Sequence, residues 1–170
     1  MHRAVADRPT SIEWKQNGVA MLIGLDPLLD ADLLYALRRM GHGDELVVVD
    51  TNFPAASTAR KAVVTRPITM SGVSAPRAIE AVLSVMPLDD FVDNPVFRME
   101  VVGDPSAVPP VQEEVQAVVD RVLGRHLPMQ GIERHAFYAR AASAFAVLVS
   151  GEIRSYGCFI LKKGIVRAAA

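Results

Sequence analysis

Hydrophobic positions along the chain change repeatedly between a helical spacing and a strand-like run. Asp30 is a predicted N-cap, because Leu33, Leu34 and Leu37 behind it fall on one helical face, and Gly41 is the predicted stop. The same reasoning predicts further helices at 75–86, 110–123 and 133–144. Strands are predicted at 46–49, 63–68, 96–102, 146–149 and 157–161.

Helices and strands alternate, which is typical of one layered α/β/α domain with a mixed, largely parallel sheet. The run 46–49 is continuously apolar, so we expect helices to cover both faces of that strand. Pro67 favours an edge position for the strand around it. Residues 55–61, 88–95 and 124–131 are expected to be loops. They carry small, acidic or glycine-bounded sequences without sustained periodicity.

The first twenty residues differ from the rest, because they are polar and lack a periodic apolar pattern. We interpret residues 1–20 as a flexible N-terminal extension and residues 21–170 as the folded domain. A structural arm docked on the domain is the alternative for residues 1–20. The extension has no long apolar stretch after its basic residues, so it does not resemble a secretory signal.

Composition narrows the classes of function. The 170 residues are 51% hydrophobic, and 18 basic side chains nearly balance 19 acidic ones. No basic stripe for nucleic acid is present, and no apolar run approaches the ~20 residues of a membrane span. A single cysteine, Cys158, cannot form an internal disulfide, which fits the cytoplasm. The apolar content is high for a small monomer and leaves room for subunit contacts.

His42 and Asp50 are the first candidates for chemistry, and they flank the buried strand 46–49. An imidazole is the side chain best suited to moving protons near neutral pH, and glycines on either side leave this one accessible. Asp50 stands where the strand ends, the place where α/β sheets gather ligands. The alternatives are a histidine that interacts with a helix C-terminus and an aspartate that caps a turn.

Three further side chains are candidates for binding. Arg134 and Tyr138 are four residues apart on a predicted helix, so they share a face and could offer a guanidinium and a phenol together. Tyr156 directly precedes the last predicted strand, and Gly157 is the next residue after Tyr156. The alternatives are a surface arginine over a packed tyrosine, and a core or edge aromatic for Tyr156.

Several chemistries lack support in the sequence. His42, His126 and His135 show no metal-ligand spacing, and Cys158 has no cysteine partner, so it is expected to be a small buried hydrophobe. No nucleophile elbow, phosphate-binding loop or dinucleotide glycine motif is present. We therefore expect no metal and no cofactor.

Sequence motifs in both halves resemble the L-fucose mutarotase and D-ribose pyranase family. In the first half these are Met21-Leu-Ile-Gly-Leu-Asp-Pro-Leu-Leu, Met40-Gly-His-Gly-Asp-Glu, and Asp50 with Phe53-Pro54. In the second half they are Glu133-Arg-His-Ala-Phe-Tyr, Ala144-Phe-Ala, Gly151-Glu and Tyr156-Gly-Cys, followed by Leu161-Lys-Lys-Gly. The resemblance covers residues 21–166 and is closer to the fucose branch, because the ribose branch would have a histidine at Arg134.

The resemblance implies a cofactor-free enzyme that interconverts anomers of a free monosaccharide. It also implies a homo-oligomeric ring, often of ten subunits, with sites near subunit interfaces. His42 matches the proton-donating histidine of the family, and Tyr138 matches a tyrosine near the site. Asp50, Arg134 and the segment Tyr156-Gly157-Cys158 match positions that contact the sugar. We expect His42, with Tyr156 and Tyr138, to carry the protons.

Two positions depart from the family pattern and bear on the choice of sugar. Cys158 stands where the family commonly has asparagine, and a thiol lacks the paired donor and acceptor of an amide. Asn52 stands where a histidine is frequent. The alternatives to a fucose mutarotase are therefore a non-catalytic monosaccharide-binding accessory of uptake or regulation, and an enzyme acting on another polyol or sugar acid.

Overall fold

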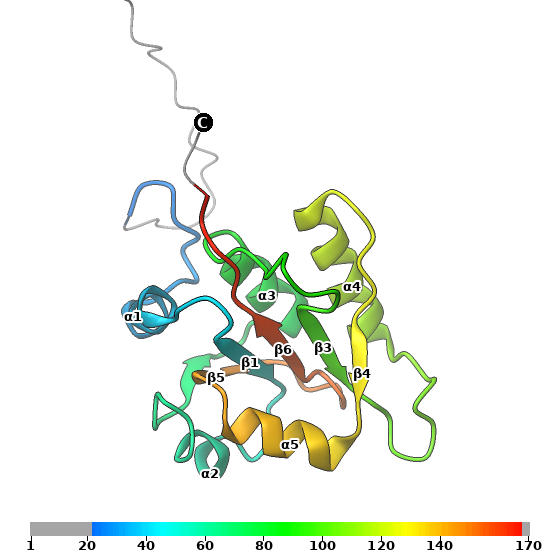
Figure 1. Ribbon diagram of the computed structural model, residues 1–170. Helices are drawn as coiled ribbons and strands as arrows, with labels where there is room; N and C mark the ends of the chain where they lie inside the picture. The colour runs from blue at the N-terminus through cyan, green and yellow to red at the C-terminus, as the bar shows by residue number, and fades with distance from the viewer. Residues whose placement is uncertain (1–21, 168–170) are drawn as a thin grey trace, which may run out of the picture.

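The computed structural model describes residues 22–167, so the predicted extension at 1–20 lies outside the described residues. One six-stranded sheet in the order β2-β5-β1-β6-β3-β4 forms the centre, with helices on both faces (Figure 1). The strands are β1 (Glu45–Val49), β2 (Ile68–Met70), β3 (Val96–Met99), β4 (Gln130–Ile132), β5 (Ala146–Ser150) and β6 (Phe159–Lys162). The helices are α1 (Ala31–Arg39), α2 (Ala55–Ala59), α3 (Ala75–Leu83), α4 (Pro110–Leu123) and α5 (Arg134–Ala142).

Strand β1 shows why the domain has three layers. Leu46 and Val48 lie in a core with α1, α3 and α4, whereas Val47 and Val49 lie in a second core with α2 and α5. All four side chains are fully buried, because successive side chains of a strand point to opposite faces of the sheet. The predicted α/β/α architecture is therefore confirmed.

Strand β6 alone runs against the direction of the others. It pairs antiparallel with β1 on one side and with β3 on the other. The pairs β1–β5, β2–β5 and β3–β4 are parallel, as the largely parallel prediction requires. The start of β6 consequently lies beside the ends of β1 and β3.

Helix α1 begins as predicted and ends differently. The Asp30 carboxylate accepts a hydrogen bond from the Leu33 N–H (2.8 Å), as an N-cap does. At the other end Met40 is the C-cap in an extended conformation, so Gly41 is not the stop. Lys163 directly follows β6, and its ammonium donates to the Met40 carbonyl (2.5 Å). This hydrogen bond satisfies one of the free carbonyl groups at the end of the helix.

Three predictions about elements were wrong. Residues 55–61 contain helix α2, because small side chains such as Ala55 and Ala59 pack closely against the second core. The strand predicted at 63–68 is limited to β2, which is an edge strand as expected, and Pro67 lies just before it. The loop predicted at 124–131 ends in strand β4, which is too short to leave a periodic pattern.

Gly164 joins the end of β6 to the segment that carries Asp89. A Cβ at Gly164 would overlap the Leu88 backbone carbonyl and lie 3.0 Å from Asp89 Cα. The Gly164 N–H donates to the Pro87 carbonyl (2.8 Å), so the two segments are held in register at this point. The close approach of two backbones is what requires glycine here.

We expect Gly164→Ala to lower the free energy of unfolding by about 2 kcal/mol, because backbone rather than a flexible side chain must move. Urea denaturation at neutral pH measures this. Gly41→Ala is the matched control, because its Cβ would meet only the Asp44 carboxylate at an ordinary 3.6 Å. Equal stabilities for the two variants would contradict the prediction.

Candidate functional site

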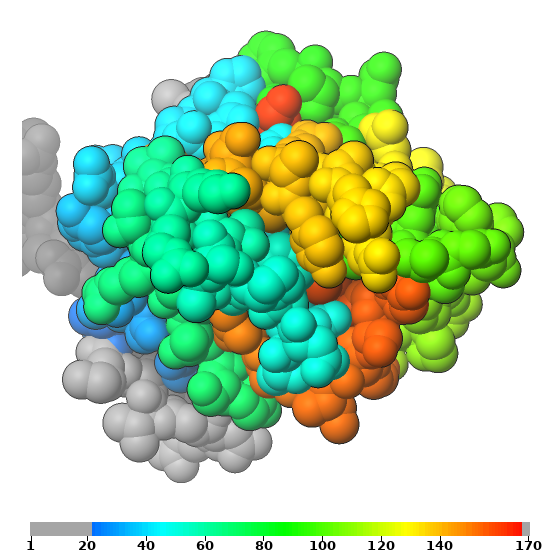
Figure 2. Space-filling view, turned by 90° about the horizontal axis from the view of Figure 1, so that it is seen from below, coloured from blue at the N-terminus to red at the C-terminus, as the bar shows by residue number. Residues whose placement is uncertain are grey.

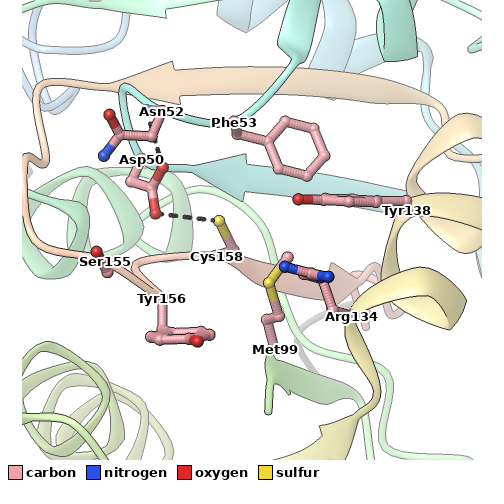
Figure 3. Close-up of a pocket in the computed structure, with 9 residues that line it drawn as sticks. All are labelled: Asp50, Asn52, Phe53, Met99, Arg134, Tyr138, Ser155, Tyr156 and Cys158. Atoms are coloured by element: carbon pink, nitrogen blue, oxygen red, sulfur yellow. Dashed lines mark hydrogen bonds between the residues drawn. The ribbon is translucent and has the colours of Figure 1, made fainter. Parts of the chain in front are cut away.

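A pocket opens at the carboxyl ends of β1 and β3, where the chain enters β6. Its volume is about 270 Å³, close to the lower end of the roughly 300–1,000 Å³ typical of ligand pockets. Figure 2 views the face on which the segment after β1 (cyan), helix α5 (gold) and the segment before β6 (orange-red) come together. The lining residues are Asp50, Asn52, Phe53, Met99, Arg134, Tyr138, Ser155, Tyr156 and Cys158 (Figure 3).

Asp50 and Cys158 form the floor of the pocket. Asp50 is 4% exposed, and its Oδ1 accepts a hydrogen bond from the Asn52 N–H (3.0 Å). The Cys158 thiol lies 3.4 Å from Asp50 Oδ2 and donates to it (Figure 3). Burial, and secondly the charge of Asp50, raise the pKa of the Cys158 thiol well above its usual range, so it stays neutral. Cys158 is buried as predicted, but it also contributes a polar group to the pocket.

Arg134 and Tyr138 project into the pocket from α5, on one helical face as their spacing predicts (Figure 3). The Phe53 ring packs edge-on against Tyr138, with ring centroids 5.3 Å apart. The Nε of Arg134 is buried and has no hydrogen-bond partner within residues 22–167. A buried donor without a partner is costly, so this N–H is available for a ligand oxygen.

Tyr156 is held in an unusual backbone conformation. Its φ is +64°, and it is the one non-glycine residue with positive φ in the described part of the chain. Its phenol oxygen accepts a hydrogen bond from the Val102 N–H (3.3 Å), which leaves the phenol proton free to be donated. Gly157 does not line the pocket. It is needed behind Tyr156, because a Cβ there would lie 2.7 Å from Glu152 Cγ.

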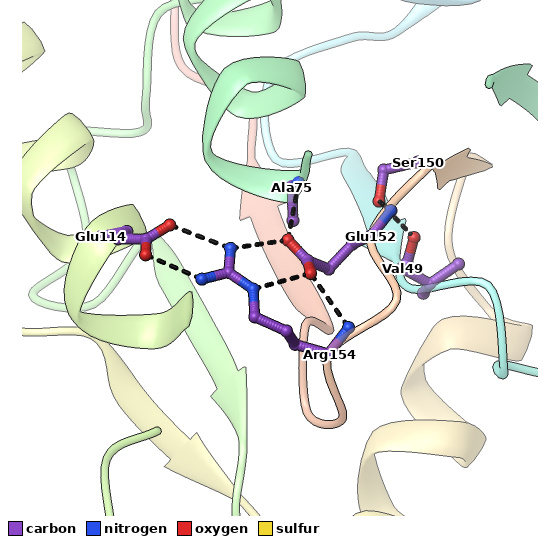
Figure 4. Close-up of polar contacts among 6 residues, drawn as sticks. All are labelled: Val49, Ala75, Glu114, Ser150, Glu152 and Arg154. Carbon is purple, nitrogen blue, oxygen red and sulfur yellow. Dashed lines mark hydrogen bonds and ion pairs between the residues drawn. The ribbon is translucent and has the colours of Figure 1, made fainter. Parts of the chain in front are cut away.

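A buried carboxylate, Glu152, supports the segment before β6 (Figure 4). Arg154 donates to both oxygens of Glu152 (2.8 and 2.9 Å) and to both oxygens of Glu114 on α4 (2.7 and 2.9 Å). The Ala75 N–H at the start of α3 also donates to Glu152 (3.3 Å). The hydrogen bonds from Arg154, above all, lower the pKa of Glu152 to about 2. This network fixes the turn that delivers Tyr156.

His42 does not lie in the pocket of its own chain. It precedes β1, whereas Asp50 follows it, and the five residues of that strand rise roughly 16 Å in total. His42 Nε2 lies 3.0 Å from Asp89 Oδ1, and the imidazole packs against Phe91 with centroids 5.2 Å apart. Of the predicted sugar-contacting residues, all except Gly157 thus line one pocket. His42 lies at the opposite end of the sheet.

Asp89 defines the chemistry available to His42. Burial opposes its ionisation, but hydrogen bonds from His42 and from the Phe91 N–H outweigh burial and lower the pKa of Asp89. An ionised carboxylate only accepts hydrogen bonds, so His42 Nε2 donates to it, and Nδ1 is the ring nitrogen that remains for other contacts. The side chain of His42 is 45% exposed, so a ligand or a neighbouring molecule can reach it.

Sequence reasoning gave no role to four residues that build these two places, namely Asp89, Gln112, Glu152 and Arg154, although Glu152 stood in the Gly151-Glu motif. Gln112 left a signal: it falls on the same helical face as Val115 and Val119, where an amide is out of place. Asp89 and Arg154 sit in charged loops and left no local signal. Asn52, recognised as a departure from the family, does line the pocket.

The described residues contain no cluster of three or more histidine, cysteine, aspartate or glutamate side chains that could hold a metal ion. Within the same residues, no helix has the length and apolar character that crossing a membrane requires. The polar groups of the pocket are hydrogen-bond donors and acceptors arranged around a small cavity. Such a set can bind a polyhydroxylated ring and exchange protons with it.

The fold and the site therefore define a small α/β protein with a polar pocket at the carboxyl ends of its strands. Residues 23–166 match the model of the RbsD / FucU transport protein family. The chain belongs to this family.

Individual relatives agree with this assignment. The human fucose mutarotase is 42% identical over 148 residues, which cover 85% of this chain and 94% of the relative. The crystal structure of protein Atu2016 is 51% identical, with a TM-score of 0.85, covering 88% of this chain and 99% of that one. The fucose mutarotase from Streptococcus pneumoniae, crystallised in complex with L-fucose, is 34% identical with a TM-score of 0.77, covering 86% and 100%.

Glu152→Gln tests the buried network through pH. The folded-state pKa of about 2 lies below the ordinary 4.5, so Glu152 stabilises the fold above about pH 5, and this contribution disappears as pH falls towards 2. We expect Glu152→Gln to lose about 3 kcal/mol at pH 7 in urea denaturation, and the gap from the wild type to close with acid. Glu114→Gln is the matched control, because that carboxylate binds the same arginine but is exposed. A gap that does not change with pH would contradict the assignment.

Proposed function

We propose that this chain is a cofactor-free sugar mutarotase that interconverts the anomers, and where possible the ring forms, of a free monosaccharide. L-fucose or a related aldose is the proposed substrate. The observation that carries the proposal is the buried Arg134 Nε, which has no hydrogen-bond partner among the described residues and lies on the wall of a pocket floored by the Asp50 carboxylate. The mutarotase relatives support the same reaction, because they match over most of both chains.

The reaction needs only general acid/base catalysis. Ring opening breaks the bond between the anomeric carbon and the ring oxygen, while a proton leaves the anomeric hydroxyl and one is delivered to the ring oxygen. After the open carbonyl turns, closure on its other face re-forms that bond and reverses both proton transfers. Asp50 retains lone pairs that can accept hydrogen bonds from sugar hydroxyls, and Arg134 Nε–H can donate a hydrogen bond to a sugar oxygen. Tyr138 and Tyr156 offer phenol protons on opposite sides of the cavity (Figure 3). Cys158 presents a neutral thiol on Asp50, and we propose that it adjusts which sugar is preferred.

His42 enters the mechanism from a second copy of the chain. A separation of roughly 16 Å across β1 is beyond a hydrogen bond or a single bridging water, so His42 cannot serve the pocket of its own chain. Exposed apolar side chains occur near both places: Phe91 beside His42 is 63% exposed, and Ile153 before the pocket segment is 79% exposed. We propose a homo-oligomeric ring in which each pocket receives a His42–Asp89 pair from a neighbour. The lone, buried Cys158 thiol suits a cytoplasmic protein.

A monosaccharide-binding protein without turnover is the second candidate. It is favoured by the distance of His42 from the pocket within one chain, since binding requires only Asp50, Arg134 and the tyrosines. The two candidates differ in whether His42 matters to anything besides packing.

Saturation-transfer proton NMR on equilibrium mixtures of L-fucose, D-ribose and other aldoses distinguishes them. We expect faster exchange between anomers for at least one sugar, and loss of about 10²–10⁴-fold in that acceleration for His42→Ala with sugar binding retained. His126→Ala is the matched control, because His126 also pairs with an aspartate (Asp120, 2.6 Å) but lies on the surface of the described chain. Sugar broadening without faster exchange would instead identify a binding protein.

Mixing two inactive variants tests whether His42 acts between subunits. His42→Ala and Arg134→Ala oligomers are mixed in equal amounts and allowed to exchange subunits. Random assembly places an intact His42 beside an intact pocket with probability one half times one half, so we expect about a quarter of wild-type activity per site. If His42 served its own chain, every site would lack one residue and activity would stay absent.

A further inference from the structure

We propose that Gln112 is a positioning residue of the pocket, whose side-chain amide holds Tyr156 and the end of β3 in the geometry that binds the sugar. The proposal rests on the proposed function, because it assigns a role in the same pocket. Gln112 itself does not line that pocket.

The side-chain amide of Gln112 makes three hydrogen bonds, two of them to residues that line the pocket. Gln112 lies in the first turn of α4 and is fully buried. Its Nε2 donates to the Met99 carbonyl (2.8 Å) and to the Tyr156 carbonyl (3.0 Å). Its Oε1 accepts from the Arg98 guanidinium (3.1 Å). Met99 and Tyr156 both line the pocket, so one amide fixes two of its walls.

The amide acts where two strands separate. β3 and β6 pair in register up to Arg98 and Phe159, and the Met99 N–H still donates to the Cys158 carbonyl (3.1 Å). Beyond this hydrogen bond the two segments, the one after β3 and the one before β6, diverge around the pocket. The Gln112 amide bridges the Met99 and Tyr156 carbonyl oxygens there, and so continues the connection that the strands no longer make.

Tyr156 needs such support because its backbone is in the left-handed region. A non-glycine residue there is strained by roughly 1–2 kcal/mol, and it stays in place only when its surroundings hold it. The Gln112 amide holds its carbonyl, and the Val102 N–H holds its phenol oxygen. Without Gln112 the peptide after Tyr156 can turn, and the phenol then leaves the pocket wall.

A packing role alone would not select glutamine. Its neighbours on the helix face, Val111, Val115 and Val119, are fully buried and apolar. A buried amide is costly unless every donor and acceptor is paired, and an apolar side chain would avoid that cost. Two of its three hydrogen bonds, to the Met99 and Tyr156 carbonyls, lead to residues that line the pocket, which is what a positioning role requires.

The test compares Gln112→Met with Gln116→Met in the full-length protein. Gln116 is a matched control one turn further along α4. Its Nε2 donates to the Leu127 carbonyl (2.7 Å) and its Oε1 accepts from the Met129 N–H (3.0 Å), away from the pocket. We expect Gln112→Met to lower kcat/KM for the exchanged sugar at least about tenfold and to weaken sugar binding. Gln116→Met should change kcat/KM by less than about twofold, even if it loses as much stability.

A double-mutant cycle separates positioning from general damage. If Gln112 acts through Tyr156, then adding Gln112→Met to Tyr156→Ala should cause little further loss in kcat/KM. Additive losses in a folded double variant would overturn the proposal, as would an unchanged kcat/KM and sugar affinity in Gln112→Met. If Gln112→Met does not fold, Gln112→Glu replaces it. That variant keeps the acceptor for Arg98 but loses both donated hydrogen bonds, and we expect the same loss.

The wild-type measurement keeps the two proposals apart. If the wild type broadens sugar resonances without accelerating anomer exchange, the proposed mutarotase activity is overturned. The role of Gln112 is then tested by the sugar affinity of its variants. A wild type that is active beside an equally active Gln112→Met overturns only the positioning role. A wild type that neither binds nor turns over any sugar overturns both.

Discussion

The antiparallel pairing of β6 between β1 and β3 is the constraint on which both functional regions depend. Because β6 runs against its neighbours, its start lies at their carboxyl ends and its finish at their beginnings. The start brings Tyr156 and Cys158 beside Asp50. The finish holds the other region, since the Gly43 N–H donates to the Lys163 carbonyl (2.9 Å) and the Asp89 N–H donates to the Lys162 carbonyl (3.0 Å). One strand therefore positions both the pocket and the His42–Asp89 pair.

Buried ionisable groups in and behind the pocket have protonation states that their neighbours fix before any ligand binds. Glu152 is held ionised by Arg154, and Asp50 faces a thiol that burial keeps neutral. Arg134 presents a donor that no described residue occupies. Groups fixed in this way need little rearrangement when a polar ligand enters, which is how a small site achieves useful proton transfer.

The arrangement also explains why a subunit interface suits this chemistry. The pocket is small and partly open, and the imidazole best suited to moving protons is half-exposed at the far end of the same sheet. In the oligomer that we propose, a neighbouring copy would bring its His42 to the pocket. An isolated chain has the sugar-contacting groups, whereas the oligomer we propose would have the complete reaction site.

The sequence by itself determined what depends on local spacing: the buried strand 46–49, the faces of the main helices, the α/β class, and the pairing of Arg134 with Tyr138 on one face. These features follow from the side-chain periods of strands and helices, which can be read from residues that are neighbours in the sequence. The resemblance in motifs also drew attention to Asp50, Tyr156 and Cys158, which line the pocket. Only the tertiary structure decided the direction of β6, the contact between Cys158 and Asp50, the Gln112 bridge, the Glu152–Arg154 network and the distance of His42 from the pocket. Each of these joins residues far apart in the chain, and their register is set by packing across the sheet rather than by any local pattern.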